Sequence, residues 1–174
     1  MSDATPQPRV VFAHGKESGP WGSKITHLAR IAETLGFVVE SLDYQDMDDP
    51  QERVAHLIDH APSGAPLVLV GSSMGGYVSA MSCAALAPEA LLLLAPALYL
   101  EGYPGEPLAC PADTVVVHGW DDDIVPLASS LDFARPRRAA LHVLADGHRL
   151  ANSIGFIERV FTAQLQRVLT TSSD

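Results

Sequence analysis

The sequence predicts an α/β protein with three layers, in which helices cover both faces of a mostly parallel six-stranded sheet. Two observations favour this class. Segments typical of strands alternate with segments of helical periodicity along all 174 residues, and the connections between them are short. In addition, residues 91–95 form a continuous apolar run between prolines, which is typical of a central parallel strand covered on both faces. A single domain over residues 1–174 is therefore expected.

The composition excludes several classes of function. The net charge of −10, with only 11 Lys and Arg, argues against a surface for nucleic acid or anionic membranes. The first eight residues contain no apolar signal core and no later run could span a bilayer, so a cytoplasmic protein is expected. Cys83 and Cys110 belong to no C-x-x-C motif, which favours free thiols over a disulfide or zinc site. The oligomeric state stays open.

Each element is predicted by a local pattern. Runs rich in β-branched and apolar residues predict strands at residues 9–13, 37–44, 67–70, 91–95, 114–117 and 140–144. Helical spacing predicts helices over residues 24–35, 50–61 and 74–86, a short one after residue 126 and a long one over 154–168. Ser23 is expected to cap the first helix, and Asp49 followed by Pro50 is expected to begin the second.

One connection differs from the others. Residues 96–112 contain four prolines and two glycines, so they predict an irregular segment, here called the excursion, where a helix would otherwise be expected. The excursion follows the fourth predicted strand, close to the end of the third strand. Its apolar side chains are Leu98, Tyr99, Leu100 and Tyr103. They are candidate substrate-binding residues, and the alternative is that they pack under the loop as a small cluster of their own.

The third strand ends in a pattern that indicates a nucleophile. The apolar segment 67–70 continues directly into Gly71-Ser72-Ser73-Met74-Gly75, which contains G-x-S-x-G. Strand, sharp turn and small-residue helix form the context in which this pattern is a nucleophile elbow, and the glycines relieve steric clashes in the strained turn. Ser72 is not flanked by glycines on both sides and is interpreted as a small turn residue. Ser73 is the candidate nucleophile.

Two further loops at strand ends carry groups that could activate a serine. His118 and the acidic run Asp121–Asp123 follow the fifth strand, and His148 follows the sixth. Reactive groups of parallel sheets collect at the carboxyl ends of the strands. A serine needs an imidazole to accept its proton and a carboxylate to orient that imidazole, so the order Ser, Asp, His fits an acyl-transfer site.

The acidic run has two other interpretations. It could be a solvated turn or, together with His118, a metal site. Consecutive side chains rarely converge on one ion, so no metal and no other cofactor are expected. Apart from His148, the histidines are interpreted as structural or solvated, with His14 and His118 bracing their turns; this set comprises His14, His27, His56, His60, His118 and His142.

These motifs resemble those of the α/β-hydrolase family over almost the whole chain, from Val10 to about Leu169. The family has an H-G segment after an early strand, the elbow serine, an H-G-x-x-D-x-x-V-P segment and a G-H segment, and all four occur here in that order. The opening residues, from His14 to Lys24, further resemble a group of small bacterial esterase-like hydrolases.

The resemblance implies a role for each motif. Matching H-G-x-x-D-x-x-V-P to residues 118–126 implies that Asp122 is the acid, and matching G-H implies that His148 is the base. It also implies an oxyanion hole formed by the backbone amides of Met74 and Lys16. Larger members of the family begin with two extra strands and carry a helical cap, which the excursion would replace. The chain thus resembles a minimal, nearly lidless member.

The function expected from these residues is a serine hydrolase that cleaves small carboxylic esters or thioesters through an acyl-enzyme. A small-molecule substrate is the expected partner. Two alternatives remain at this point: a ligand-binding or regulatory protein that keeps the site with little turnover, and a cofactor-free perhydrolase. The natural acyl and leaving groups depend on pocket shape, which one sequence does not determine.

Overall fold

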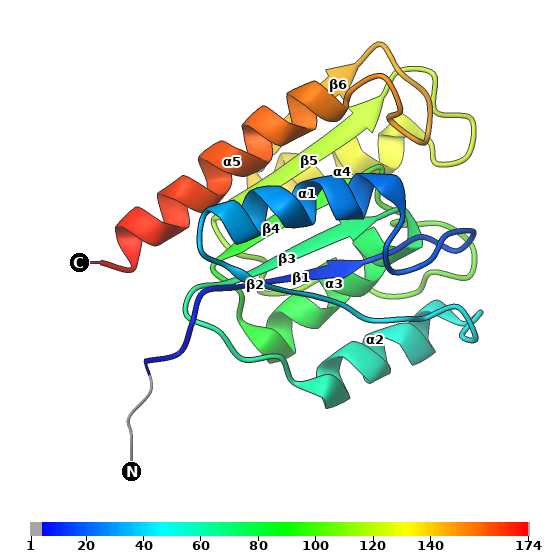
Figure 1. Ribbon diagram of the computed structural model, residues 1–174. Helices are drawn as coiled ribbons and strands as arrows, with labels where there is room; N and C mark the ends of the chain where they lie inside the picture. The colour runs from blue at the N-terminus through cyan, green and yellow to red at the C-terminus, as the bar shows by residue number, and fades with distance from the viewer. Residues whose placement is uncertain (1–4, 174) are drawn as a thin grey trace.

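The computed structural model describes residues 5–173, which form one parallel sheet and five helices (Figure 1). In chain order the elements are β1 (Arg9–Ala13), α1 (Ser23–Thr34), β2 (Val38–Ser41), α2 (Pro50–His60), β3 (Leu67–Ser72), α3 (Met74–Leu86), β4 (Ala90–Leu94), β5 (Asp113–Gly119), α4 (Leu127–Arg137), β6 (Ala140–Leu144) and α5 (Ile154–Thr171). The strand order is β2-β1-β3-β4-β5-β6, and every neighbouring pair is parallel. All carboxyl ends of the strands therefore meet at one edge.

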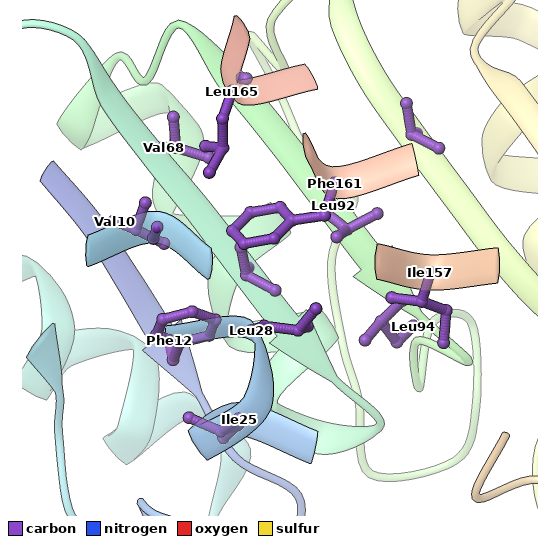
Figure 2. Close-up of a cluster of buried hydrophobic side chains, with 14 of the residues drawn as sticks. Val10, Phe12, Ile25, Leu28, Val68, Leu92, Leu94, Ile157, Phe161 and Leu165 are labelled. Carbon is purple, nitrogen blue, oxygen red and sulfur yellow. The ribbon is translucent and has the colours of Figure 1, made fainter. Parts of the chain in front are cut away.

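The helices cover both faces of the sheet, which confirms the predicted three layers (Figure 1). Helices α1 and α5 pack on one face, while α2, α3 and α4 pack on the other. On the first face, Phe161 of α5 meets Phe12 of β1 edge to face, with ring centroids 6.3 Å apart (Figure 2). Strand β4 is buried along its entire length, as its continuous apolar run predicted. The two layers hold the central strands, and hence the loops that follow them, in place.

Local signals predicted several boundaries correctly. The bounds of β1, α3 and β6 are those expected, and Asp49 caps α2 by accepting a hydrogen bond from the amide of Gln51 at 2.9 Å. The predicted cap of α1 is wrong. Ser23 is already helical, Gly22 occupies the cap position, and among the described residues no side chain caps this first turn. Instead, the amide of Thr26 donates to the carbonyl of Gly22 at 2.9 Å.

The second strand is shorter than predicted: its pairing with β1 ends where Phe12 meets Ser41, although β1 itself continues to Ala13. Beyond that point the chain turns over the end of β1, and the amide of Tyr44 donates to Nε2 of His14 at 2.9 Å. The excursion contains no helix or strand, as predicted. It is attached to α4 by Arg137, which donates to the Glu106 carboxylate and the Pro107 carbonyl, both at 2.6 Å.

Candidate active site

Ser73 occupies a strained turn between β3 and α3. Its backbone angles are φ 55° and ψ −119°, a conformation that residues other than glycine rarely adopt. Hydrogen bonds hold both the backbone amide and the backbone carbonyl of Ser73. The Ser73 amide donates to the carbonyl of Leu94 at 2.9 Å, and its carbonyl accepts from the amide of Ala97 at 2.9 Å. The hydroxyl is thereby presented above the end of β3.

The elbow glycines are required by close backbone contacts. A Cβ added to Gly71 would lie 2.1 Å from the carbonyl oxygen of Gly75, so the turn itself excludes a side chain there. A Cβ on Gly75 would lie 1.9 Å from the carbonyl oxygen of Ala13. The second glycine is therefore demanded by the neighbouring strand β1 rather than by the turn, a reason that the sequence pattern does not contain.

Ser73, His148 and Asp122 come together from three separate loops. Nδ1 of His148 donates to Oδ2 of Asp122 at 2.8 Å, because a carboxylate oxygen can only accept. The unprotonated Nε2 of the same ring then faces the Ser73 hydroxyl, whose Oγ lies 2.9 Å away. The three side chains thus form one continuous hydrogen-bonded chain from hydroxyl to carboxylate.

Asp122 is the buried member of the acidic run. Its side chain is 1% exposed, and its Oδ1 accepts from the amides of Ile124 and Val125 at 2.9 and 2.8 Å. Asp121 and Asp123 are exposed. Within residues 5–173, no group of three or more His, Cys, Asp or Glu side chains is arranged to hold a metal ion. The turn directs one carboxylate inward, toward His148.

His118 also contacts this carboxylate, although the sequence analysis left it as a residue that braces its turn. It does brace the turn, since Nε2 donates to the Val125 carbonyl at 2.9 Å. The same Nε2 lies 3.2 Å from Oδ2 of Asp122, and neither side chain is more than 1% exposed. Nδ1 accepts from the buried hydroxyl of Ser130 at 2.8 Å. The spacing His118–Asp122 was the available signal, but it does not reveal that both side chains turn inward.

Asp146 anchors the loop that carries His148. Its Oδ1 accepts from the amide of Gly147 at 2.8 Å, and Oδ2 accepts from the Asn152 amide and the Ser153 hydroxyl at 2.9 and 2.7 Å. Burial alone would raise the pKa of this carboxyl, but these hydrogen bonds, with a smaller contribution from Lys24, outweigh it and lower the pKa. Asp146 is therefore ionised at neutral pH and fixes the path of the loop.

Two backbone amides beside Ser73 are free to bind a ligand. Met74 opens α3, so its amide lacks a helical partner. Lys16 follows Gly15, and a Cβ built on Gly15 would lie 3.5 Å from the Cβ of Ser73. Among residues 5–173, neither amide donates a hydrogen bond to any other group. The residues named for the oxyanion hole thus lie beside the serine with unused donors.

The four candidate substrate-binding residues are largely occupied with protein contacts. Leu98 is 1% exposed and belongs to the core under α3. The Tyr99 hydroxyl donates to the Glu106 carboxylate at 2.9 Å, and Tyr103 packs edge to face on Tyr77 with ring centroids 5.3 Å apart. Leu100 is half-buried. These contacts favour the packed-cluster interpretation for Leu98, while a substrate-binding role for the set stays a prediction.

None of the helices among the described residues is both long and apolar enough to cross a membrane. Comparison with known sequences gives one family match: residues 9–108 fit a model described as an uncharacterised protein family, UPF0227. No curated protein matches the chain.

Solved structures give closer likenesses. A candidate hydrolase of the alpha/beta superfamily from Xanthomonas campestris pv. campestris is 33% identical, with 92% of this chain and 99% of that chain covered and a TM-score of 0.84. An α/β serine hydrolase without a lid from Xanthomonas campestris is 21% identical, with 95% and 85% covered and a TM-score of 0.64. Est1E from Butyrivibrio proteoclasticus is 16% identical, with 97% and 90% covered and a TM-score of 0.76.

The last two likenesses show the fold alone, whereas the first combines fold with sequence identity over almost the full length of both chains. The family model matches more than half of this chain, including the first H-G segment and the elbow. The family match shows that the chain belongs to UPF0227, and the 33% identity over almost the full length of a hydrolase of the alpha/beta superfamily shows that it belongs to the α/β-hydrolase superfamily.

Proposed function

We propose that the protein is a serine hydrolase that cleaves small carboxylic esters or thioesters through an acyl-enzyme on Ser73. The observation that carries the proposal is the hydrogen-bonded chain from the Ser73 hydroxyl through His148 to the buried Asp122. A serine is a weak nucleophile until a positioned base takes its proton, and this arrangement supplies that base with its tautomer set by the acid.

Each group has a step in the proposed reaction. Oγ of Ser73 attacks the carbonyl carbon while its proton passes to Nε2 of His148, and Asp122 stabilises the imidazolium that forms. The oxyanion accepts hydrogen bonds from the Met74 and Lys16 amides, and the positive end of α3 favours the same charge. His148 then gives the proton to the leaving alcohol or thiol. A water molecule repeats the sequence on the acyl-enzyme and releases the acid.

The structural relatives support a hydrolase but do not define its substrate. Est1E, which shares the fold, has been solved with ferulic acid bound. Its sequence identity of 15% is too low to transfer that ligand. The small-molecule class of substrate is consistent with the hydrolase fold, and the oligomeric state plays no part in the proposal.

The proposal is tested with p-nitrophenyl esters and matched thioesters of increasing acyl length. Wild-type protein should release the chromophore, and Ser73→Ala should lower kcat by about 10⁴-fold or more, the scale seen when triads are dismantled. Ser72→Ala is the matched control and should retain activity, because Ser72 lies at the end of β3, outside the hydrogen-bonded chain. A fluorophosphonate should label Ser73. Full turnover by Ser73→Ala, or labelling that moves to Ser72, would refute the assignment.

The excursion leads to an expectation about acyl length. It carries no helix that could cover the strand ends, and its apolar side chains are partly used in packing. A methylene contributes about 0.8 kcal/mol only where it is truly buried. We expect kcat/KM to rise from acetyl to butyryl or hexanoyl esters and then to level. A continuing rise beyond decanoyl would show that the excursion closes over the substrate.

A further inference from the structure

Arg53 of α2 is buried in a way that is unusual for an arginine. Its side chain is 1% exposed, yet no carboxylate oxygen of the described residues lies within 4.0 Å of it. Arginine is almost never fully buried without a paired charge, because removing the guanidinium from water is costly. A residue kept in the interior under these conditions calls for an explanation in terms of what it binds.

The guanidinium binds backbone carbonyls instead of an acid. Nη1 donates to the carbonyls of His14 and Gly15 at 3.2 and 3.3 Å, and Nε donates to the carbonyl of Met47 at 2.8 Å. The cation also lies 5.5 Å from the ring centroid of Tyr44. Two of the three carbonyls belong to the loop that follows β1 and runs past Ser73.

The Gly15 carbonyl receives a second strong donor. Nδ1 of His14 donates to it at 2.7 Å, and Nε2 of the same ring accepts from the Tyr44 amide, which fixes the tautomer. The carbonyl oxygen is thus held between an imidazole N–H and a guanidinium, on the buried side of the loop. His14 itself is fully buried, so this arrangement excludes water.

A planar trans peptide bond transmits this anchoring to the next residue. The N–H of a peptide unit points opposite to its C=O, so pulling the Gly15 carbonyl inward turns the Lys16 N–H outward. That amide lacks a partner among residues 5–173, and Gly15 lies directly beside Ser73. We propose that Arg53 is a positioning residue of the oxyanion hole: it anchors the Gly15 carbonyl so that the Lys16 amide faces the substrate oxygen. This inference rests on the proposed serine-hydrolase function.

The charge of Arg53 serves the same end. Burial lowers the pKa of the guanidinium, but arginine titrates so far above neutrality that it stays charged. A cation at the carbonyl end of a peptide polarises the unit and makes its N–H a stronger donor. The preorganised amide then needs no reorganisation when negative charge develops on the substrate, which is the condition for efficient electrostatic stabilisation.

Arg53→Lys and Arg53→Met separate charge, reach and packing. Lysine keeps the charge but loses the guanidinium's planar array of donors, and methionine keeps much of the stem without the charge. Arg167→Met is the matched control, because Arg167 pairs with Asp113 through two bonds of 2.9 and 3.0 Å on the exposed surface of α5. Rates are expressed per active site, titrated with a fluorophosphonate, so that loss of folded protein does not count as loss of catalysis.

We expect both Arg53 variants to lower kcat for a butyryl ester about 10- to 100-fold with little change in KM, since a donor used mainly in the transition state is displaced. The affinity for a boronic acid, which forms a tetrahedral adduct on the serine, should fall by a similar factor. Arg167→Met should change neither. Wild-type kcat per active site in both Arg53 variants would overturn the inference while leaving the Ser73 assignment intact.

A second measurement does not need turnover. In labelled protein, the carbonyl ¹³C of Gly15 and the amide ¹⁵N and ¹H of Lys16 report the hydrogen bonds on that peptide unit. All three chemical shifts should change in Arg53→Lys and stay unchanged in Arg167→Met. If wild-type protein hydrolyses no ester, the proposed function fails, and these resonances still decide the positioning role: unchanged positions in Arg53→Lys would refute it.

Discussion

Asp122 is held by donors on both of its carboxylate oxygens. Two backbone amides bind Oδ1, while the rings of His148 and His118 face Oδ2. A buried carboxylate without such partners would be strongly destabilised, so the second imidazole helps to hold this group in its orientation. Because His118 is itself fixed by Ser130, the orientation of the proposed acid depends on two residues outside the hydrogen-bonded chain of Ser73, His148 and Asp122.

Replacing His118 with Phe should therefore reduce kcat, although His118 acts only through Asp122 and does not contact the substrate. A hydrogen bond to a charged group contributes about 1.5–3 kcal/mol, which corresponds to roughly a 10- to 100-fold loss of kcat if Asp122 loses its orientation. Steady-state kinetics per titrated active site is the measurement. His142→Phe is the control, since His142 of β6 packs edge to face against Phe156 of α5. Equal kcat values for the two variants would show that His118 only braces its turn.

Cys110 gains reactivity from a neighbour far away in sequence. The adjoining Cys83 side chain lowers the pKa of the Cys110 thiol to about 7, and Arg137 acts in the same direction, while burial opposes both. The same pairing, together with burial, raises the pKa of Cys83. The thiol lies in an open hollow of about 380 Å³ that the excursion forms with the end of α4.

We expect iodoacetamide to alkylate Cys110 with a rate that rises with pH and is half-maximal near pH 7, because only the thiolate reacts. Mass spectrometry of peptides follows the rate at each cysteine. Arg137→Met should move the midpoint upward, and Cys83 should stay unlabelled in folded protein. A midpoint at the ordinary thiol value, or labelling of Cys83 first, would contradict the expectation.

At the scale of elements, the elbow is a junction of three backbones rather than a turn alone. Strand β1 ends against the first turn of α3, where the Ala13 carbonyl would meet any Cβ on Gly75. Gly76 is closely approached too, since its Cβ would lie 2.7 Å from the Cβ of Pro96 at the start of the excursion. The small residues of α3 thus let strands and helix converge on Ser73.

Gly75→Ala should destabilise the protein strongly, because either β1 or α3 must move to make room. Over-packing of this kind costs about 1–3 kcal/mol or more in the free energy of unfolding. Gly155→Ala is a matched control at the second position of α5, where the nearest atom is the flexible end of Arg159 at 3.8 Å. There we expect a neutral or slightly stabilising effect from helix propensity. Urea unfolding that ranks the two variants the other way would disprove the steric argument.

At the scale of the whole molecule, the parallel sheet brings distant segments to one edge. Ser73, Asp122 and His148 follow β3, β5 and β6, and Lys16 follows β1. The two faces of helices keep these strands in register through a core that includes Phe12, Leu92 and Phe161 (Figure 2). The chain as a whole carries a net charge of −10.

That charge should disfavour polyanionic substrates. We expect KM for butyryl-coenzyme A to exceed KM for a neutral butyryl thioester, and the ratio to shrink as salt is added, because about 0.1 M salt screens exposed charges beyond roughly 10 Å. Comparing the two thioesters at low and high ionic strength gives the measurement. A lower KM for the coenzyme A ester at low salt would point to a local cationic site that overrides the net charge.

The sequence by itself determined the fold class, the order of the elements and the three residues of the hydrogen-bonded chain. These depend on short-range patterns: glycines around Ser73, the position of His148 after the last strand, and, for Asp122, the resemblance of residues 118–126 to the family's H-G-x-x-D-x-x-V-P segment. The strand and helix patterns imply a parallel sheet, and a parallel sheet places the ends of its strands together whatever the packing details. The bounds of α3 and β6 followed from equally local signals.

Only the tertiary structure decided how these residues are supported. Arg53 lies 38 and 39 positions from two of the three carbonyls that it binds, and Cys83 is near Cys110 because the excursion folds back toward α3. Leu98 is drawn into the core, and β2 ends early, at Ser41, where its pairing with β1 stops. Such contacts form between side chains whose local sequence carries no mark of them. They are set by which surfaces the sheet and helices press together, so they emerge only once the whole chain is packed.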